Sequence, residues 1–506
     1  MRKGDKFTLM DNFKLIDIFA GPGGLGEGFA SLSDSKRKRH FKLSLSIEMD
    51  AHAHQTLELR SFFRQFPFGK VPEDYYDYLR HHITRKDLFD AHQSQFKEAS
   101  LEAWHKELGD GDDKEIDKRI KRVINKDDKW VLIGGPPCQA YSVVGRSRTG
   151  GIRSSDKRLY LYKEYLRILK KHKPHAFIME NVKGLLSASL QSQSIFKQIK
   201  KDLETCGYDI YPLTSTENDT NLFGENTFSP SDFIIRMEDF GIPQARHRVI
   251  MMGVRKDLGL SRDDIKPLKE KDPVSLQSVL KDLPRLRSGL SKVPDSDSKW
   301  AATIKRSRNI SWFKNIDKQQ QNLIVSISSN GSLPHGRGDN NLVKCAAIGK
   351  DIHEQNWFTD NNMGGVCNHE TRGHIESDIH RYLFMSSYGK LKDKSPDLND
   401  IPKGLLPKHK NLKSGHFKDR FKVQLASRPS STVTCHISKD GHYYILYDPS
   451  QCRSLTVREA ARIQTFPDNY FFCGSRTQQY RQVGNAVPPL LSKQIAEVVL
   501  NLLKKI

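Results

Sequence analysis

The residues whose types and spacing are best suited to catalysis surround one cysteine. Cys138 follows the run Gly134–Pro137, which reads Gly-Gly-Pro-Pro and comes directly after the apolar segment 130–133. Two prolines make a stiff, non-helical loop that projects the next side chain at the end of a predicted strand. A thiol that is partly exposed and close to a helix N-terminus forms the nucleophilic thiolate more easily. The pattern therefore favours a reactive cysteine over a buried structural one.

Charged side chains stand beside two other apolar segments. Glu180 comes directly after Ala176–Met179, and Arg246 and Arg248 lie just before Val249–Gly253. A carboxylate at the mouth of a sheet is a candidate general acid, or a hydrogen-bonding partner for a ring nitrogen. Arginines two positions apart on a strand point to one face, and together they could hold an oxygen or a phosphate. Alone, each of these groups could equally be ordinary surface charge.

A glycine-rich turn near the start of the chain predicts a cofactor. Gly21, Gly23 and Gly26 follow the segment Leu15–Ala20 and fit the G-x-G-x-x-G fingerprint. Glu48 stands about 20 residues further on, where the fingerprint has an acid that binds ribose hydroxyls. The turn does not choose between a nicotinamide dinucleotide and S-adenosylmethionine, because both carry an adenosine. Only the residues around Cys138 can discriminate between these two cofactors.

The residues that could do chemistry lie at the ends of short apolar segments. These segments alternate with stretches whose apolar residues have helical spacing. This alternation predicts a doubly wound, Rossmann-like α/β sheet, in which ligands bind beyond the carboxyl ends of the strands. The predicted buried strands are Leu15–Ala20, Trp130–Ile133 and Ala176–Met179. Further elements are predicted as a helix over Leu159–Leu169, a strand over Tyr443–Tyr447, and helices over Thr456–Gln464 and Ser492–Leu503.

The character of the sequence changes along the chain and predicts two units. Residues 1–257 and 466–506 are expected to form a catalytic domain with a helical insertion at about 66–128. Residues 258–465 have weaker apolar periodicity and much Ser, Asn, Gly and Lys, and are expected to form a smaller, loop-rich domain.

The composition restricts the partner and the compartment. The 506 residues hold 82 Lys and Arg against 60 Asp and Glu, a formal net charge of +22, which favours a polyanion such as nucleic acid. Seven cysteines are scattered without a C-x-x-C pair, so neither a disulfide framework nor a zinc ribbon is expected. We see no secretory signal and no apolar run of membrane-spanning length. We expect a cytoplasmic protein.

In chain order, the motifs resemble those of one known family. The chain has a Phe-Ala-Gly-x-Gly-Gly turn, Pro-Pro-Cys-Gln, Glu-Asn-Val, Gln-x-Arg-x-Arg and, at Gly484–Pro489, Gly-Asn-Ala-Val-Pro-Pro. This series is similar to that of DNA cytosine-5 methyltransferases of the bacterial restriction-modification type, over most of residues 13–254 and 426–500. The resemblance implies methyl transfer from S-adenosyl-L-methionine to C5 of cytosine, without a metal.

The resemblance implies a role for each matching residue. Cys138 would add to C6 of cytosine and make C5 electron-rich enough to accept a methyl group. Glu180 would hold N3 and the exocyclic amine while charge develops on the ring. Arg246 and Arg248 would contact the base O2 and neighbouring backbone.

The cofactor contacts are implied in the same way. Phe19 would pack on the adenine, Glu48 would bind the ribose hydroxyls, and Asn485 with Val487 would close the methionine side. The other implied contacts are Gly21, Gly23, Gly24, Leu25, Met49, Pro137 and Leu161. The family usually has an acid shortly after the third strand that reads the adenine amine. Asp87 is a weak match, so that contact is left open.

The implied substrate is double-stranded DNA, with the target base flipped out of the helix. The lysine-rich segment Lys403–Lys422, inside the predicted recognition domain, suits phosphate contact. The expected DNA contacts are Gln139, Ser142, Lys418, Arg420 and Lys422. Asn368–His374 lacks the spacing of a zinc site, so no metal is expected there. We expect a nucleoid-associated monomer that works with a restriction or other phage-defence system.

Three alternatives stay open. An RNA cytosine-5 methyltransferase would share the motifs, although a long recognition region favours DNA because sequence readout needs a surface that reaches the major groove. A nicotinamide oxidoreductase would explain the glycines and Glu48 but not Pro-Pro-Cys or Glu-Asn-Val. A DNA-binding protein that keeps the scaffold without catalysis would be expected to show degraded motifs, and these are intact.

Overall fold

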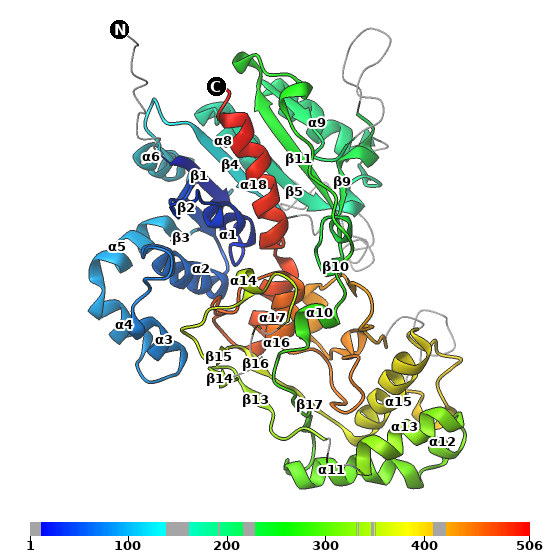
Figure 1. Cartoon of the computed structure of the whole chain (residues 1–506). Helices are drawn as coiled ribbons and strands as arrows, with labels where there is room; N and C mark the ends of the chain where they lie inside the picture. The colour runs from blue at the N-terminus through cyan, green and yellow to red at the C-terminus, as the bar shows by residue number, and fades with distance from the viewer. Residues whose placement is uncertain are drawn as a thin grey trace, which may run out of the picture.

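The computed structural model describes residues 12–137, 161–190, 193–215, 228–329, 331, 333–345, 349, 351–407 and 421–506. In Figure 1 its upper half is a twisted sheet flanked by helices, and its lower half holds helices and short two-stranded ribbons. Among these residues, no helix is long and apolar enough to cross a membrane.

An eight-stranded mixed sheet carries most of the predicted site residues. Its order is β3-β2-β1-β4-β5-β11-β8, with β9 paired beside β11. The five strands from β3 to β5 run parallel, whereas β11 is antiparallel to β5 and β8. The bounds are β1 (Phe13–Ile18), β2 (Phe41–Glu48), β3 (Ala103–His105), β4 (Trp130–Gly134), β5 (Ala176–Val182), β8 (Tyr208–Tyr211), β9 (Ile234–Arg236) and β11 (His247–Arg255). The predicted doubly wound sheet is confirmed, and its strand order reverses between β1 and β4, where such sheets bind ligands.

Apolar side chains alternate between the two faces of the sheet, and helices cover both. Leu15 and Val131 pack with α1 and α18 on one face, whereas Ile16 and Leu132 pack with α6, α8 and α9 on the other. The C-terminal helix therefore lies against the N-terminal sheet (Figure 1). The bounds are α1 (Gly24–Ser31), α6 (Asp113–Val123), α8 (Leu161–His172), α9 (Ile195–Thr205) and α18 (Pro489–Leu503).

Helices follow α2 (Ala51–Arg64) in the predicted insertion, but a strand lies among them. The helices are α3 (Glu73–Leu79), α4 (Arg85–Ala91), α5 (Gln93–Glu102) and α6. Between α5 and α6 lies β3, which pairs with β2 at the sheet edge. The sequence did not predict β3 because its three residues, Ala-Trp-His, form no apolar run. The third strand along the chain is therefore β3, and Trp130–Ile133 belongs to the fourth.

The lower half of Figure 1 has apolar cores of its own. Trp300 and Trp312 are buried in a helical core made by α11 (Asp297–Arg306), α12 (Ser311–Lys314), α13 (Lys318–Ser329) and α15 (Glu376–Lys392). A second core joins α10 (Gln277–Leu280), α16 (Val457–Ile463) and α17 (Arg476–Asn485), and lies between this helical core and the sheet.

Two predictions in this half had different outcomes. The helix predicted over Thr456–Gln464 is confirmed as α16, which begins at a capping box between Thr456 and Glu459. The strand predicted over Tyr443–Tyr447 is wrong. Residues 442–444 form a 3-10 turn, and Ile445 makes isolated bridges to Val423 and Ser454. Apolar and aromatic residues fill this segment because it is buried, not because it joins a sheet.

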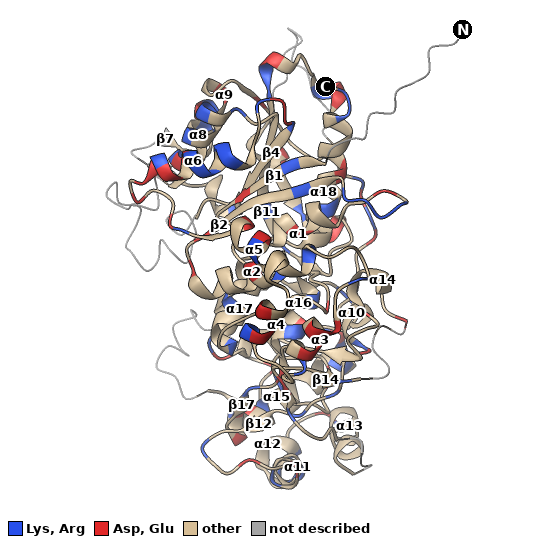
Figure 2. Ribbon diagram, turned by 90° about the vertical axis from the view of Figure 1, so that its left-hand side faces the viewer, with Lys and Arg blue, Asp and Glu red and all other residues tan. Residues whose placement is uncertain are grey.

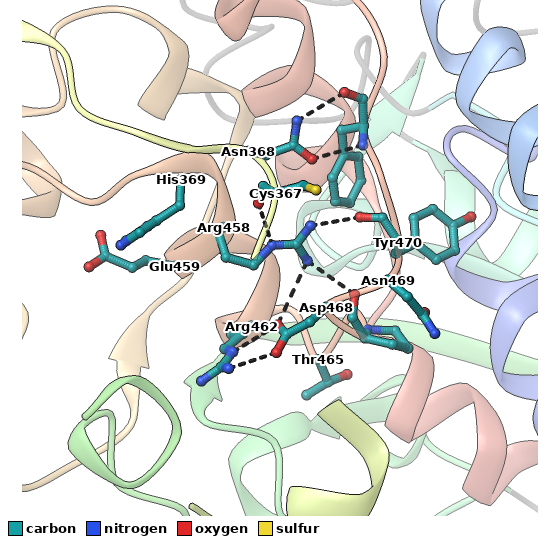
Figure 3. A network of polar contacts seen from close by, with 12 residues as sticks. Cys367, Asn368, His369, Arg458, Glu459, Arg462, Thr465, Asp468, Asn469 and Tyr470 are labelled. Atoms are coloured by element: carbon teal, nitrogen blue, oxygen red, sulfur yellow. Dashed lines mark hydrogen bonds and ion pairs between the residues drawn. The ribbon is translucent and has the colours of Figure 1, made fainter. Parts of the chain in front are cut away.

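Buried arginines of α16 tie together the segments around it (Figure 3). Arg458 donates to the carbonyl oxygens of Cys367 (2.8 Å), Pro467 (3.0 Å) and Tyr470 (2.8 Å). Arg462 pairs with Asp468 at 2.7 Å and with Asp282. Removing one partner of such buried groups is costly, about 3–5 kcal/mol for an ion pair. The network ties the segments that carry Asp282, Cys367 and Asp468 to α16.

Candidate active site

Glu180 and Arg248 meet at the carboxyl end of β5. In the antiparallel pair, Glu180 lies opposite Ile250 and Arg248 lies opposite Val182, so the two charged side chains are diagonal neighbours on one face. Arg248 Nε and Glu180 Oε1 are 3.0 Å apart, and each side chain is 14% exposed. Partial burial strengthens their attraction relative to a pair in bulk water. The carboxylate is therefore held at the mouth of the sheet.

The loop that leads to the predicted nucleophile begins against this carboxylate. A Cβ atom on Gly135 would stand 3.0 Å from Glu180 Oε2, so the loop backbone lies directly on the carboxylate. Asn181 is buried beside it and donates from Nδ2 to the carbonyl of Pro136 at 3.5 Å. Pro137 ends the described stretch, and Cys138, Gln139 and Ser142 lie outside the described residues. The start of the Pro-Pro-Cys loop is thus in contact with the Glu180–Arg248 pair.

Arg246 occupies a different position from Arg248. It lies between β10 (Gln244–Ala245) and β11, and it is 1% exposed. Its Nη1 donates to the carbonyl oxygens of Val433 (2.8 Å) and Gly484 (3.2 Å). The prediction that both arginines share one face assumed a continuous strand, but Arg246 lies at the break between two strands. The structure therefore joins Arg246 to the end of α17, and its contact with a base stays a prediction.

The glycine-rich turn after β1 lies against the Glu48 carboxylate. Glu48 ends β2 and accepts hydrogen bonds from the backbone N–H groups of Gly21 and Asp50, both at 2.7 Å. Burial raises the pKa of the Glu48 carboxyl, and these N–H groups oppose that rise. Phe19, in the same turn, has a φ of 55°, a left-handed value that is uncommon for a bulky residue. Such strain is typical of ligand-binding turns.

A turn from the end of the chain closes over the glycine-rich one. A Cβ atom on Gly24 would stand 2.2 Å from the carbonyl oxygen of Val487, so the two backbones touch. Gly23, with a φ of 91°, caps α1, and Leu25 is buried in its first turn. Val487 is buried, whereas Asn485 is exposed at the end of α17. The structure thus brings together the predicted cofactor residues from both ends of the sequence.

Two more predicted cofactor residues lie beside the end of β3. His105 Nε2 is 2.9 Å from the carbonyl oxygen of Met49, which follows Glu48 and is exposed. Leu161, at the start of α8, lies 3.3 Å from the position of a Cβ on Gly109. Both residues therefore border the same edge of the sheet as the glycine-rich turn.

Asp87 has a structural task away from this edge. Its carboxylate caps α4 and accepts hydrogen bonds from Thr84 N (2.9 Å) and Thr84 Oγ1 (2.8 Å). The third strand ends at His105, so the acid that follows it is Glu107, which is exposed. Sequence reasoning missed Glu107 because it missed β3.

The sequence analysis also did not identify a buried carboxyl beneath the glycine-rich turn. Asp17 in β1 is 0% exposed, and its Oδ2 stands 3.1 Å from the position of a Cβ on Gly26. Burial raises the pKa of this carboxyl to about 8. An acid inside the apolar segment Leu15–Ala20 was the signal that could have found it.

Comparison with known proteins assigns the chain to a family. The sequence profile of the C-5 cytosine-specific DNA methylases matches residues 86–501. The chain belongs to this family. It is a DNA cytosine-5 methyltransferase, and the family uses S-adenosylmethionine as its methyl donor.

Relatives match this methyltransferase along nearly its whole length. The type II methyltransferase M.Bpa9945I of Bacillus paralicheniformis is 33% identical over 504 residues, which cover 96% of this chain and 98% of that protein. The type II methyltransferase M1.HphI of Haemophilus parahaemolyticus is 26% identical over 487 residues, covering 96% and 86%. A prophage-encoded E. coli protein, described as a candidate DNA modification methyltransferase, has a similar crystal structure. The TM-score is 0.51 at 19% identity, over 97% of this chain and 100% of that one, which supports the fold.

The structure describes one of the five predicted DNA contacts of the methyltransferase. Lys422 donates its backbone N–H to the carbonyl of His442 at 3.0 Å, and its Nζ lies 5.4 Å from the centre of the Tyr443 ring. Lys418 and Arg420 lie outside the described residues, as do Gln139 and Ser142. The DNA contact of Lys422 stays a prediction.

The first histidine of the segment Asn368–His374 has a structural role. His369 is buried, with Nδ1 2.9 Å from Thr456 Oγ1 and Nε2 2.9 Å from the carbonyl oxygen of Pro284. Both ring nitrogens are engaged within the protein. This residue therefore links the segment around Pro284 to Thr456 at the N-terminus of α16.

Proposed function

We propose that this methyltransferase modifies cytosine within a specific site of double-stranded DNA, through a covalent bond between Cys138 Sγ and C6 of the base. The observation that carries the proposal is the Glu180–Arg248 pair, packed against the loop that leads to Cys138. A base stacked inside a duplex cannot reach the edge of this sheet. The cytosine would therefore be flipped out, at a cost of roughly a few kcal/mol of unstacking.

Each residue then has a defined task on the flipped base. Cys138, as the thiolate, forms the Sγ–C6 bond, and the electrons of the C5–C6 double bond make C5 nucleophilic. Glu180 holds N3 and the exocyclic amine, so that the charge developing on the ring meets a fixed partner. Arg248 fixes the orientation of that carboxylate and lies next to it for contact with O2. After C5 has gained its methyl group it loses its proton, and cleavage of the Sγ–C6 bond restores the aromatic ring and the thiolate.

The residues around the glycine-rich turn fit the methyl donor. S-adenosyl-L-methionine supplies an electrophilic methyl group when it is bound. Glu48, at the end of β2, would accept hydrogen bonds from the ribose hydroxyls, and Phe19 would pack on the adenine. Asn485 and Val487 would close the methionine side, where Val487 already touches the turn. Glu107, as the acid that follows β3, is our candidate for the adenine amine.

We further propose that residues 258–465 read the DNA site, while 1–257 and 466–506 form the catalytic domain. The apolar core shared by α10, α16 and α17 crosses residue 465, so the two units are packed together rather than loosely linked. M.Bpa9945I and M1.HphI are type II methyltransferases. Their similarity supports a role in a restriction-modification system, and we expect the chain to act there as a monomer.

Two experiments test the mechanism. Cys138→Ser should abolish the methylation seen by bisulfite sequencing of DNA from expressing cells, while calorimetry shows unchanged binding of S-adenosylmethionine. Cys206→Ser, a half-buried thiol beside α9, is the matched control and should stay active. The wild-type protein should also form a covalent adduct with duplex DNA that carries 5-fluorocytosine, because fluorine at C5 cannot leave as a proton does.

The outcomes separate the alternatives. Full activity of Cys138→Ser would remove the proposed nucleophile. Methyl transfer to transfer RNA with none to duplex DNA would replace the proposed substrate with RNA. The bisulfite map of the wild type also gives the recognised sequence, because methylated cytosines share their neighbours.

A further inference from the structure

A small cavity lies between the recognition half and the N-terminal turn of α17. Its volume is about 300 Å³. Its walls come from Ser291, which follows β12 (Gly289–Leu290), from β17 (Gly373–His374), from the end of the 3-10 turn Cys435–Ser438 with the segment after it, and from α17. The lining residues used below are Arg372, His374, Lys439, Arg476 and Thr477. In Figure 2, α17, β12 and β17 lie toward the left-hand side of the molecule.

Two residues that line this cavity carry buried polar atoms without partners. His374 is 4% exposed and Arg372 is 8% exposed. Neither His374 Nε2 nor Arg372 Nε has a hydrogen-bond partner within the described part of the chain. Leaving such a group unsatisfied costs about 1–3 kcal/mol, so native proteins supply a partner, a water or a ligand.

The charge of the walls selects an anion. Arg372, Lys439 and Arg476 face two lining acids, of which Asp378 is already paired with Arg381. Arg476 also lies 3.8 Å from Glu370, outside the lining, and donates to the carbonyl of Thr371 at 3.1 Å. The first turn of α17 adds backbone N–H groups and the positive end of the helix dipole, which together bind phosphate in many proteins. Thr477, exposed in that turn, adds a hydroxyl. The cavity therefore fits a group with one negative charge and several acceptor oxygens.

Arg372 also holds the wall in place. Its Nη1 and Nη2 donate to the carbonyl oxygens of Lys439 (3.0 Å) and Ile437 (2.8 Å), and its guanidinium lies 4.7 Å from the centre of the Tyr480 ring on α17. The loop that carries Lys439 is thus fixed against the helix that carries Arg476. The backbone positions of Lys439, which is exposed, and Arg476, which is half-buried, are therefore fixed relative to each other.

The position of the cavity relates it to the active site through α17. Arg476 begins this helix and Gly484, which accepts from Arg246, lies eight residues later. At 1.5 Å per residue the two are about 12 Å apart along the helix axis. A DNA strand rises about 3.4 Å per base pair, so this separation is on the scale of a few base pairs. The predicted DNA contact Lys422 borders the same cavity, because its N–H donates to His442, which lines it.

We propose that this cavity binds one backbone phosphate of the substrate DNA, within a few base pairs of the flipped cytosine, through Arg476, Lys439 and the N-terminal turn of α17. The proposal rests on duplex DNA being the substrate. A phosphate held there fixes the register of the duplex relative to the active site, and it carries no sequence information by itself.

The test measures how DNA binding depends on salt. Each phosphate contact contributes about −0.9 to the slope of log K against log salt concentration. Arg476→Ala and Lys439→Ala should each make the slope less steep, by up to about 0.9, and should weaken binding by up to about fivefold at 0.15 M salt. The loss should be the same on cognate and unrelated duplexes. Lys118→Ala is the charge-matched control, since Lys118 is exposed on α6 away from this cavity, and it should leave the slope unchanged.

A second readout locates the phosphate. Cognate duplexes with single methylphosphonate linkages, which are uncharged, should show one position near the target cytosine where the wild type binds weakly. Arg476→Ala should lose its sensitivity at that position alone. Unchanged slopes and an unchanged methylphosphonate profile in both variants would overturn the proposal and leave a water-filled cavity. If the wild type does not methylate duplex DNA at all, the proposed substrate fails instead.

Discussion

Replacing Arg246 with alanine shows whether this residue acts on the base or on the protein. Its guanidinium is 1% exposed and donates to the carbonyls of Val433 and Gly484. The chain turns after Gly484 into the segment whose Val487 carbonyl lies on Gly24. Loss of Arg246 should therefore loosen the turn that we propose closes the methionine side of the cofactor site.

The expected size of the effect follows from these contacts. A hydrogen bond from a charged donor contributes about 1.5–3 kcal/mol. Two such bonds, with the cavity left by a buried side chain, give a destabilisation of about 3–5 kcal/mol. In a cooperative unit of 150–250 residues, each kcal/mol lowers Tm by roughly 2–4 °C. Tm should therefore fall by roughly 6 °C or more. The Tm of Arg246→Lys, which keeps the charge but has fewer hydrogen-bond donors, should lie between those of the wild type and Arg246→Ala.

Thermal unfolding and steady-state kinetics measure the two possible roles separately. We expect Arg246→Ala to raise the KM for S-adenosylmethionine about tenfold, equivalent to about 1.4 kcal/mol, and to change kcat little at saturating cofactor. Arg248→Ala is the control, because its partly exposed side chain is paired with Glu180. That variant should keep its Tm and lose kcat. An Arg246→Ala enzyme with normal Tm and KM and a kcat as low as that of Arg248→Ala would refute the positioning role.

Three further substitutions test other parts of the site. Gly24→Ala would bring a Cβ within 2.2 Å of Val487 O, so affinity for S-adenosylmethionine should fall by about tenfold or more; unchanged calorimetric affinity would contradict the contact. Glu180→Gln keeps the shape but not the charge, and should lower kcat by roughly 100-fold or more with normal cofactor affinity; a normal kcat would exclude Glu180 from the chemistry. Burial raises the pKa of Asp17 from 3.8 to about 8, so across this window the folded protein keeps a proton that the unfolded chain has released, and stability falls as pH rises. Asp17→Asn should remove this contribution to the dependence of stability on pH. A difference in Tm between variant and wild type that stays constant between pH 5 and 8.5 would contradict the raised pKa of Asp17.

The strands that carry the site were predictable where they are long and apolar. β1, β4 and β5 are buried on both faces, so each appears in the sequence as a continuous apolar run. β3 is stabilised mainly by pairing with β2 at the sheet edge, and three residues carry too little pattern to show it. Without β3, the sequence offers Asp87 as the acid after the third strand, but the capping box at the N-terminus of α4 accounts for an acidic residue there without any ligand.

The contacts between site residues were less predictable than the residues themselves. Glu180 could be placed at a strand end from the sequence, but its pairing with Arg248 depends on β11 entering the sheet antiparallel beside β5. No local pattern fixes which strand becomes that neighbour. Arg246 shows the same limit, since alternation of side chains holds only within one strand and the chain changes strands at this residue.

α17 links these separate observations. Its last residue, Asn485, belongs to the predicted cofactor site, and its first, Arg476, lines the cavity proposed for a DNA phosphate. The helix is fixed along its length, because Tyr480 lies under Arg372 and Gly484 lies against the backbone of Cys435. A rigid element of this kind keeps the two ends about 14 Å apart, whereas loop residues such as Lys422 depend on longer connections. The phosphate at Arg476 would therefore set where the duplex stands relative to the methyl donor, and a substitution there should change DNA binding without changing affinity for the cofactor.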